Sequence, residues 1–292
     1  MSSKVFWLII SKRQERIVSV MTHSSQITGP NSALTSLVRL MVVLALSLVL
    51  SACLPKPKDQ KPLSPAAMAS LKEKGIRLGA PMYVRIFKKE SAMEVWLQNQ
   101  SGRYTKFKTY HVCRWSGELG PKTTEGDKQA PEGFYVVTPQ QMNPRSKYHL
   151  SFNIGYPNAY DRSYGYTGKH LMVHGGCESA GCYAITDEAV QELYALAREA
   201  FVGGQRKFPV HAFPFKMTDQ AMLAHVGHKW FGFWQNLKQG HDMFHITGQP
   251  PVAGVKEGRY VFFSTPSEVP DEFRVSAASA DPSAPQLVRG WR

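Results

Sequence analysis

The sequence predicts an α+β fold that is mainly β, with helices flanking a β-sandwich or barrel. Short stretches in which apolar and polar residues alternate recur between residues 82 and 173, and Gly, Ser and Asn separate them. Such a series is typical of the strands of a sandwich or barrel. A later stretch, from Asp187 to Gly203, has its apolar residues at helical spacing instead. With 292 residues, 43% of them hydrophobic, the chain can form one substantial domain with tails, or two small ones.

Residues 1–52 have the layout of a secretory signal region, with a basic flank at Arg39, an apolar run and small residues at the exit. The apolar run is too short for a comfortable membrane-spanning helix. It ends in Leu50-Ser51-Ala52-Cys53, which resembles a bacterial lipobox, whose cysteine is lipidated and becomes the mature N-terminus. An uncleaved membrane anchor and a plain signal followed by an unrelated cysteine are the alternatives. Because Leu54 rather than Asp follows Cys53, the lipobox resemblance implies a periplasmic protein that is lipid-anchored in the outer membrane of a Gram-negative bacterium.

Residues 53–79 are expected to form the lipidated N-terminus and a Pro/Lys-rich linker, with a short helix over residues 65–78. The predicted strands follow this linker in order. They are Met82–Phe87, Glu94–Leu97, Lys108–Cys113, Phe134–Val137, Leu150–Ile154 and Leu171–Val173.

The clearest helix begins after Thr186 or Asp187, either of which can cap it, and ends at Gly203-Gly204. A second helical region is expected between Gln220 and Phe244, and a last strand between Val252 and Phe263. These elements divide the chain after the linker into a central domain over residues 80–216, a helical and strand extension over residues 217–263, and a disordered tail, rich in Ser, Pro and Ala, over residues 264–292.

One stretch brings together the residue types that nucleophilic catalysis needs. His174 and Cys182 are eight residues apart, and glycines lie between or beside them. A thiol needs a neighbouring base or positive charge to become the reactive thiolate, and a glycine-rich loop can fold the thiol back towards the imidazole. Gly181 also lets backbone N–H groups near Cys182 point at a common spot, as an oxyanion hole requires. A lone cysteine is usually a buried apolar residue, but this setting favours a catalytic one.

These residues resemble the active-site signature of a known enzyme family. Val173-His174-Gly175-Gly176-Cys177-Glu178-Ser179-Ala180-Gly181-Cys182-Tyr183 is similar to the signature of the L,D-transpeptidases, or YkuD domains, and looks closer still to their YafK-like subfamily. The resemblance extends over roughly residues 80–260. Further similar segments are Ser116–Lys122, Glu125–Asp127, Pro131–Tyr135, Asn153–Asp161 and Pro209–Phe215.

The resemblance implies a peptidoglycan L,D-transpeptidase whose catalytic domain is the central domain, residues 80–216. Cys182 would attack the amide carbonyl at the diamino acid of a stem peptide and form a thioester. His174 would move the protons, with the carbonyl of Gly175 orienting its ring. Backbone N–H groups around Gly181, Cys182 and Tyr183 would hold the oxyanion. No metal or organic cofactor is then needed, and a peptidoglycan-attached lipoprotein is a further candidate partner.

Two positions depart from the commoner pattern of the family. Ala180 stands where a histidine is common, and Ala184 stands where Arg or Asn is frequent. Both departures fit the subfamily and bear on the substrate. Hydrolysis of peptidoglycan–protein or stem-peptide bonds by an L,D-type amidase is therefore an alternative activity. A non-catalytic cell-wall-binding lipoprotein is the alternative from a different class.

The remaining cysteines allow several arrangements. Exported proteins meet an oxidising compartment, so a Cys113–Cys177 bridge would brace the site and leave Cys182 free, whereas a Cys177–Cys182 bridge would silence it. Two unpaired buried thiols are the third possibility. A zinc site from His174, Cys177, Cys182 and His211 has suitable ligand types, but its spacing matches no zinc ribbon or finger.

The surroundings of the predicted site leave further alternatives. Glu178 and Asp187 can serve as orienters of His174 in place of a backbone carbonyl. The loop before the site is rich in aromatic residues and is either a substrate lid or a packed cover. The residues of this aromatic loop are Tyr156, Tyr160, Tyr164, Tyr166 and His170.

The formal net charge of +13 favours an anionic polymer or lipid surface as partner, and no nucleic-acid-binding module is recognisable.

Overall fold

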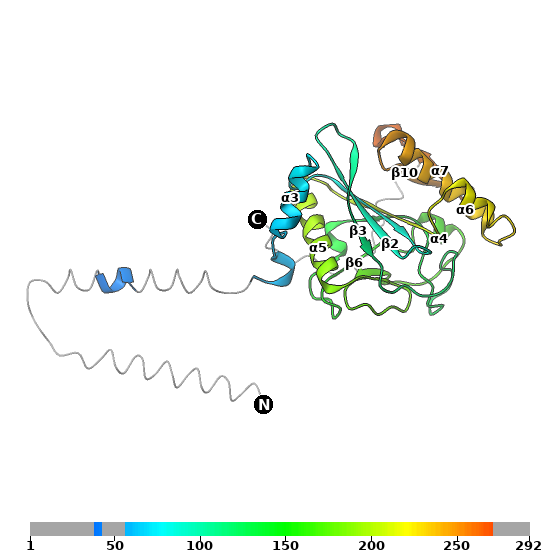
Figure 1. The fold of residues 1–292 in the computed structure, drawn as a ribbon. Coiled ribbons are helices and arrows are strands. Elements are labelled where there is room, and N and C mark those ends of the chain that lie inside the picture. Colours follow the sequence, from blue (N-terminus) through cyan, green and yellow to red (C-terminus); the bar gives the residue numbers. More distant parts are fainter. Residues whose placement is uncertain (1–37, 43–55, 271–292) are drawn as a thin grey trace, which may run out of the picture. The chain divides into compact units, whose positions relative to one another are not determined.

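The computed structural model describes residues 38–42 and 56–270 (Figure 1). Residues 38–42 are helical and belong to a separate unit, and the second compact unit begins at Lys56. Cys53, the rest of the expected signal region and residues 271–292 of the expected tail lie outside the described residues. Within the described ranges, no helix is long and apolar enough to cross a membrane.

Sheet A has five strands in the order β3-β2-β1-β9-β4. The central strand β1 pairs in parallel with β9 and antiparallel with β2. Every residue of β1 is buried, because both faces of the sheet are covered at this strand. The strands are β1 (Met82–Phe87), β2 (Ala92–Gln98), β3 (Tyr104–His111), β4 (Gly133–Val137) and β9 (Phe208–Phe213).

Sheet B is smaller and carries the predicted catalytic residues. Its order is β5-β6-β7-β8, and its last two strands run parallel. These strands are short, so loops form much of this part of the molecule. The strands are β5 (Met142–Asn143), β6 (Ser151–Asn153), β7 (Met172–His174) and β8 (Tyr183–Ala184).

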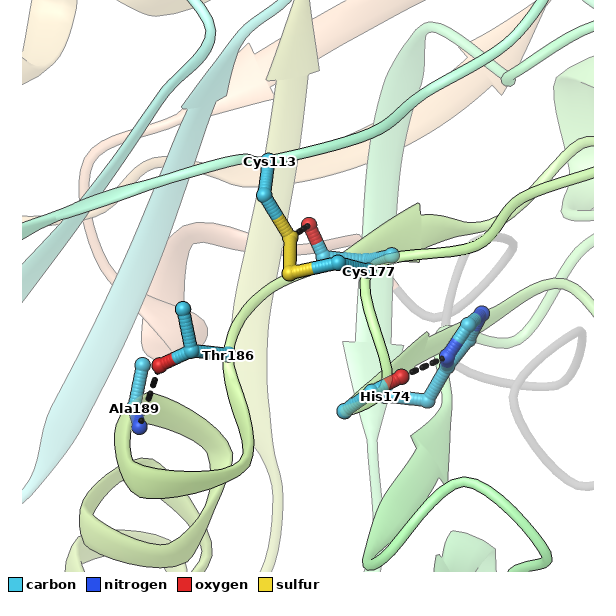
Figure 2. Close-up of a disulfide and its surroundings, with 7 residues drawn as sticks. Cys113, His174, Cys177, Thr186 and Ala189 are labelled. Atoms are coloured by element: carbon cyan, nitrogen blue, oxygen red, sulfur yellow. Dashed lines mark hydrogen bonds between the residues drawn. A yellow bond between two sulfur atoms is a disulfide. The ribbon is translucent and has the colours of Figure 1, made fainter.

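The main core lies between one face of sheet A, sheet B and the helices α3 (Pro65–Glu73) and α5 (Asp187–Val202). Helix α5 begins where the Thr186 hydroxyl accepts a hydrogen bond from the N–H of Ala189 (Figure 2). Gly203 follows the helix, and a Cβ on it would lie 2.0 Å from the carbonyl oxygen of Gly79. Only glycine therefore lets the end of α5 meet the turn before β1.

A second core covers the opposite face of sheet A. It consists largely of aromatic side chains from sheet A, from the short helix α4 (Ala159–Ser163) and from the C-terminal part of the chain. Figure 1 shows α6 and α7 on the other side of the sheet from α3 and α5. The C-terminal elements are α6 (Asp219–Leu223), α7 (Phe231–Thr247), β10 (Val252–Lys256), β11 (Arg259–Phe263) and a 3₁₀ turn at Pro266–Glu268.

The predicted fold class, α+β with a β-sandwich and flanking helices, is confirmed. Three details differ from the sequence predictions. The expected helix over residues 65–78 is present, with Leu71 buried in the main core, but it ends at Glu73, and a 3₁₀ turn at Lys58–Gln60 precedes it in the expected linker. The expected strand from Val252 to Phe263 is an antiparallel hairpin, because Glu257 and Gly258 adopt positive φ and turn the chain. The first residues of the expected disordered tail are ordered: they form a 3₁₀ turn at Pro266–Glu268, and the Ser264 N–H donates to Glu268 Oε2.

Candidate active site

The pairing of β7 with β8 places His174 and Cys182 on one face of sheet B. Val173 lies opposite Tyr183 and His174 lies opposite Ala184 in this parallel pair. Side chains alternate between the two faces of a sheet, and Val173 and Tyr183 both point into the core, with 0% exposure. His174 therefore points to the other face, as does Cys182, one residue before β8. The Met172 N–H lies 3.3 Å from Cys182 Sγ, which fixes the thiol beside β7.

His174 is held in a single orientation by its backbone neighbour and by an aromatic ring. Its Nδ1 lies 2.6 Å from the carbonyl oxygen of Gly175 (Figure 2). A carbonyl oxygen only accepts hydrogen bonds, so Nδ1 carries the proton and Nε2 is left as the acceptor. The ring of Tyr148 stacks on the imidazole with 4.8 Å between centroids. The side chain of His174 is thus pre-set to receive a proton at Nε2.

The electrostatic surroundings keep this imidazole neutral. Burial lowers the pKa of His174, which is 4% exposed. The hydrogen bond to Gly175 acts in the opposite direction, and the positive charge of Lys147 lowers the pKa further. At neutral pH His174 is therefore an uncharged base.

The two glycines after His174 lie close to neighbouring groups. A Cβ on Gly175 would lie 2.3 Å from Asp187 Oδ1, and a Cβ on Gly176 would lie 3.0 Å from the ring of Tyr148. The Gly175 N–H donates to the carbonyl oxygens of Tyr148 and Leu150, at 3.1 and 3.3 Å. These contacts fix the peptide whose carbonyl orients His174.

Cys182 is half-buried and is not part of a disulfide. Burial raises the pKa of its thiol, while the N–H of Met172 and the positive charge of Lys122 lower it. The thiol also lies 3.7 Å from the carbonyl oxygen of His170. With a neutral imidazole and a thiol of raised pKa, the resting pair is uncharged, and the proton has to move when substrate is attacked.

Ser179 shapes the turn that presents the thiol. Its hydroxyl donates to the carbonyl oxygen of Cys182 at 2.7 Å and accepts from the Gly181 N–H at 3.3 Å. Gly181 has a φ of +123°, which side-chain-bearing residues rarely adopt. The Gly181 N–H, one of the three expected oxyanion donors, is engaged by Ser179, so the N–H groups of Cys182 and Tyr183 are the remaining candidates among the three.

A disulfide joins Cys113 to Cys177, with 5.4 Å between the Cα atoms (Figure 2). Of the two bridges that the sequence allowed, this is the one that leaves Cys182 as a thiol. It links the end of β3 to the loop between His174 and Cys182. The zinc arrangement does not fit, because Cys177 is bonded to Cys113 and His211 contacts the Tyr83 hydroxyl at 2.7 Å.

The aromatic loop before the site is mostly tied to its surroundings, which favours a packed cover over a free lid. The Tyr156 hydroxyl donates to the carbonyl oxygens of Lys122 and Thr167. Tyr160 stacks on Tyr260 in the second core. The Tyr164 hydroxyl donates to the carbonyl oxygen of Gly258, although the side chain is exposed.

Among the described residues, the structure shows no hydrogen bond or ion pair between His174 and either acidic residue that was considered for orienting it. Asp187 lies 3.9 Å from His149 Nδ1, and Glu178 is exposed. Sequence reasoning missed Tyr148 and Lys122, which lie near the site. Lys122 Nζ contacts Asp127 Oδ1 at 2.5 Å and has a side-chain exposure of 6%. For Lys122 a signal existed, since it lies in the segment Ser116–Lys122 that resembles the family; for Tyr148 there was none.

The family model of the L,D-transpeptidase catalytic domain, YkuD, matches residues 81–211. A protein of Escherichia coli (strain K12) named "Putative L,D-transpeptidase YafK" is 44% identical over 184 residues, which are 63% of this chain and 74% of that protein. The same identity and coverage are found for the protein of that name from Escherichia coli O157:H7. The chain belongs to the L,D-transpeptidase family. Members of this family act on peptidoglycan stem peptides.

Solved structures with detectable similarity to this chain are more distant. The helical cell shape determining protein Pgp2 from Campylobacter jejuni has a TM-score of 0.39 and 21% identity, over 62% of this chain and 67% of that one. Bd1075 of Bdellovibrio bacteriovorus has a TM-score of 0.32 and 16% identity, over 57% of this chain and 62% of that one.

Proposed function

We propose that this protein is a peptidoglycan L,D-transpeptidase that uses Cys182 as its nucleophile and His174 as its base. The observation that carries the proposal is the pre-set imidazole. His174 Nδ1 bonds to the Gly175 carbonyl, so Nε2 is the free acceptor, and the ring shares a sheet face with the only unpaired thiol among the described residues. Membership of the family supplies the substrate class, peptidoglycan stem peptides.

The chemistry runs through a thioester. As Cys182 Sγ attacks the amide carbonyl carbon of the diamino acid residue, its proton passes to His174 Nε2. The oxyanion is stabilised by the N–H groups of Cys182 and Tyr183. His174 then gives the proton to the leaving amine, and the C–N bond breaks. An acceptor amine attacks the thioester, loses a proton to His174 and restores the Cys182 thiol with a new amide bond.

The fate of the thioester separates transfer from hydrolysis. We propose transfer to an amine, and the amidase alternative uses the same first half-reaction with water as acceptor. Defined muropeptides and intact sacculi, incubated with and without an added amine and analysed by mass spectrometry, separate the two. Amine adducts that increase with amine concentration support transfer. Free tripeptide ends with no adduct at any amine concentration would assign the protein to hydrolysis.

Replacement of the nucleophile tests the proposal at its centre. The Cys182→Ala variant is expected to lose all turnover of muropeptides, because the hydrogen bonds of the Ser179 hydroxyl to the backbone keep the turn in place but no nucleophile remains. Val202→Ser, a change of an exposed residue at the end of α5 and outside the motif, is the control and is expected to remain active. Residual turnover by Cys182→Ala would show that Cys182 is not the nucleophile, whereas a wild type without any turnover would favour the non-catalytic cell-wall-binding alternative.

The cellular location follows from the proposed lipid anchor. Leu50-Ser51-Ala52-Cys53 supports lipidation at Cys53, and Leu54 supports delivery to the outer membrane on its periplasmic face. Peptidoglycan lies in the same compartment, so substrate and enzyme would meet there. A peptidoglycan-attached lipoprotein remains a further candidate substrate under this proposal.

A further inference from the structure

A buried ion pair lies between sheet A and the loop of residues 116–131. Lys88 Nζ contacts Glu132 Oε1 at 3.0 Å, and both side chains have 0% exposure. Lys88 also donates to the carbonyl oxygens of Gly120 and Ala130, at 2.9 and 3.0 Å. The Gly120 N–H donates to Glu132 Oε1 at 2.7 Å. The pair therefore clamps both ends of the loop, one at Gly120 and the other at Ala130.

The C-terminal extension completes this clamp. Trp234 of α7 donates through its indole N–H to Glu132 Oε2, at 2.8 Å. Trp230, just before α7, stands directly over the loop, because a Cβ on Gly120 would lie 2.5 Å from its indole ring. Both oxygens of the Glu132 carboxylate are thus occupied, one by the catalytic domain and one by the extension. A buried carboxylate is tolerated only when it is paired and hydrogen-bonded in this way.

The other side of the 116–131 loop lies against the turn that presents Cys182. The Tyr183 hydroxyl donates to the carbonyl oxygen of Pro131 at 2.6 Å. A Cβ on Gly181 would lie 3.6 Å from the carbonyl oxygen of Gln129, so the loop passes within van der Waals contact of that turn. These contacts flank Cys182 on both sides in the sequence.

The same loop carries Lys122, whose charge acts on the Cys182 thiol. Lys122 is held by Asp127 at 2.5 Å and by the Thr124 carbonyl at 2.8 Å, both within the loop. A Cβ on Gly168 would lie 2.7 Å from Lys122 Cε, so the aromatic loop also rests on this side chain. Any displacement of the 116–131 loop would therefore disturb two things together: the contacts of the loop with the turn that presents Cys182, and the position of the Lys122 charge.

We infer that the C-terminal extension is a working part of the active site, in which Trp234 and Glu132 are positioning residues that hold the 116–131 loop, and with it Cys182, in place. This inference rests on the proposed role of Cys182 as nucleophile. Trp234 touches neither the thiol nor the imidazole in the contacts described above. It acts through Glu132, Gly120 and the loop, a path of consecutive hydrogen bonds and close contacts.

The test compares two indole-to-carboxylate hydrogen bonds in the full-length chain. Trp234→Phe removes the N–H that Glu132 accepts. Trp96→Phe is the matched control, because the Trp96 N–H donates to Glu94 Oε2 at 3.0 Å on β2, and its ring packs on Phe244 of the same helix α7. For each variant, the rate at which iodoacetamide alkylates Cys182 is measured as a function of pH. Muropeptide turnover and thermal unfolding are measured as well.

Trp234→Phe is expected to lower both kcat/KM and the alkylation rate at neutral pH by about tenfold or more, since a misplacement near 1 Å can cost ~10²-fold. Its alkylation profile is expected to shift to higher pH as Lys122 moves away. Trp96→Phe is expected to leave both rates unchanged within about twofold at a comparable loss of thermal stability. Equal rates for the two tryptophan variants would overturn the inference and leave a purely structural role for Trp234.

A second pair of variants covers the case in which Trp234→Phe does not fold. Tyr183→Phe removes the hydrogen bond to Pro131 at the other edge of the loop, and Tyr83→Phe removes a buried hydroxyl contact to His211 away from the loop. The inference expects slower alkylation in the first variant only. Alkylation needs no substrate, so it also separates the two proposals. A wild type inactive on muropeptides, with alkylation still dependent on Trp234, would refute the proposed function alone.

Discussion

At the scale of single residues, the notable feature is that His174 is oriented without a carboxylate. The Gly175 carbonyl holds Nδ1, and Tyr148 both stacks on the ring and accepts the Gly175 N–H through its carbonyl oxygen. Asp187, one of the two acidic candidates, lies 3.9 Å from His149 Nδ1 instead. A backbone carbonyl carries no net charge, so it fixes the tautomer without stabilising an imidazolium strongly. The burial of the ring then sets the pKa.

The first prediction concerns the acid side of the pH profile. Burial lowers the pKa of His174 below 6.5, its ordinary value, and the protonated form cannot accept the thiol proton. Activity should therefore persist into mildly acidic solution and fall only when the pH passes below that lowered pKa. The measurement is kcat/KM against pH on a defined muropeptide. An acid limb at or above pH 6.5 would contradict a neutral His174 in the free enzyme.

The second prediction concerns Tyr148. Tyr148→Leu removes the stacked ring and exposes His174 to water, so the acid limb should move up towards the ordinary value and kcat/KM should fall by about tenfold or more. Tyr148→Phe keeps the ring and should rescue both quantities to within about twofold. The paired pH profiles distinguish a positioning role from a general loss of stability. If Leu and Phe behaved alike, the stacking would not matter.

At the scale of elements, α5 depends on its contact with the turn before β1. Gly203→Ala would place a Cβ 2.0 Å from the Gly79 carbonyl oxygen, which is backbone and cannot move aside cheaply. We expect the free energy of unfolding to fall by about 1–3 kcal/mol. Gly227→Ala is the control, because its Cβ would meet nothing within 4 Å, and we expect a change of about 0.5 kcal/mol or less. Urea denaturation of both variants measures the difference.

The disulfide is the second element-scale test. The bridge joins residues 64 apart and ends in the loop between His174 and Cys182. Replacing Cys113 and Cys177 together by alanine should lower the free energy of unfolding by about 2–4 kcal/mol and loosen that loop. Muropeptide turnover should therefore fall more steeply with temperature than in the wild type. Unchanged turnover across the temperature range would show that the loop is held without the bridge.

The elements themselves were predictable wherever the local pattern carried the structural reason. Alternation predicted Met82–Phe87, the bounds of β1, and the cap at Thr186 and the glycine at 203 predicted α5. Strand β9, between β1 and β4, was missed as a strand, because Pro209 within it weakens the signal and its pairing partners lie far away in the chain.

The residues of the candidate site likewise fall into those that a local sequence pattern could predict and those that it could not. His174, Gly175 and Cys182 lie in one short motif, so the sequence could show them together. Tyr148 stacks on His174, 26 residues later in the sequence, and Trp234 of α7 donates to Glu132, 102 residues earlier. Periodicity and spacing report on neighbours in the chain, and these contacts are formed by tertiary packing. The pairing of Cys113 with Cys177 is of the same kind, since three arrangements were compatible with the sequence.

At the scale of the whole molecule, the contacts of the second unit begin within a few residues, along the sequence, of the proposed lipidation site. Lys58 already contacts the body of the domain, because Lys58 Nζ donates to the Ser146 carbonyl and Gln191 donates to the Lys58 carbonyl. Five residue steps separate Lys58 from Cys53, and an extended chain of that length spans about 17 Å. If Cys53 carries the lipid, the enzyme works near the membrane surface rather than at a distance set by a long linker.

The last prediction tests this anchoring. Cys53→Ser should move the protein into the soluble periplasmic fraction, or leave it with an uncleaved signal, because no acyl chain can then be attached. One acyl chain binds a membrane only marginally, so stable anchoring of the wild type implies more than one. Fractionation with and without detergent, with Cys182→Ala as an anchored control, measures the effect. Wild-type protein in the soluble fraction without detergent would refute the anchor and, with it, the short reach inferred from Lys58.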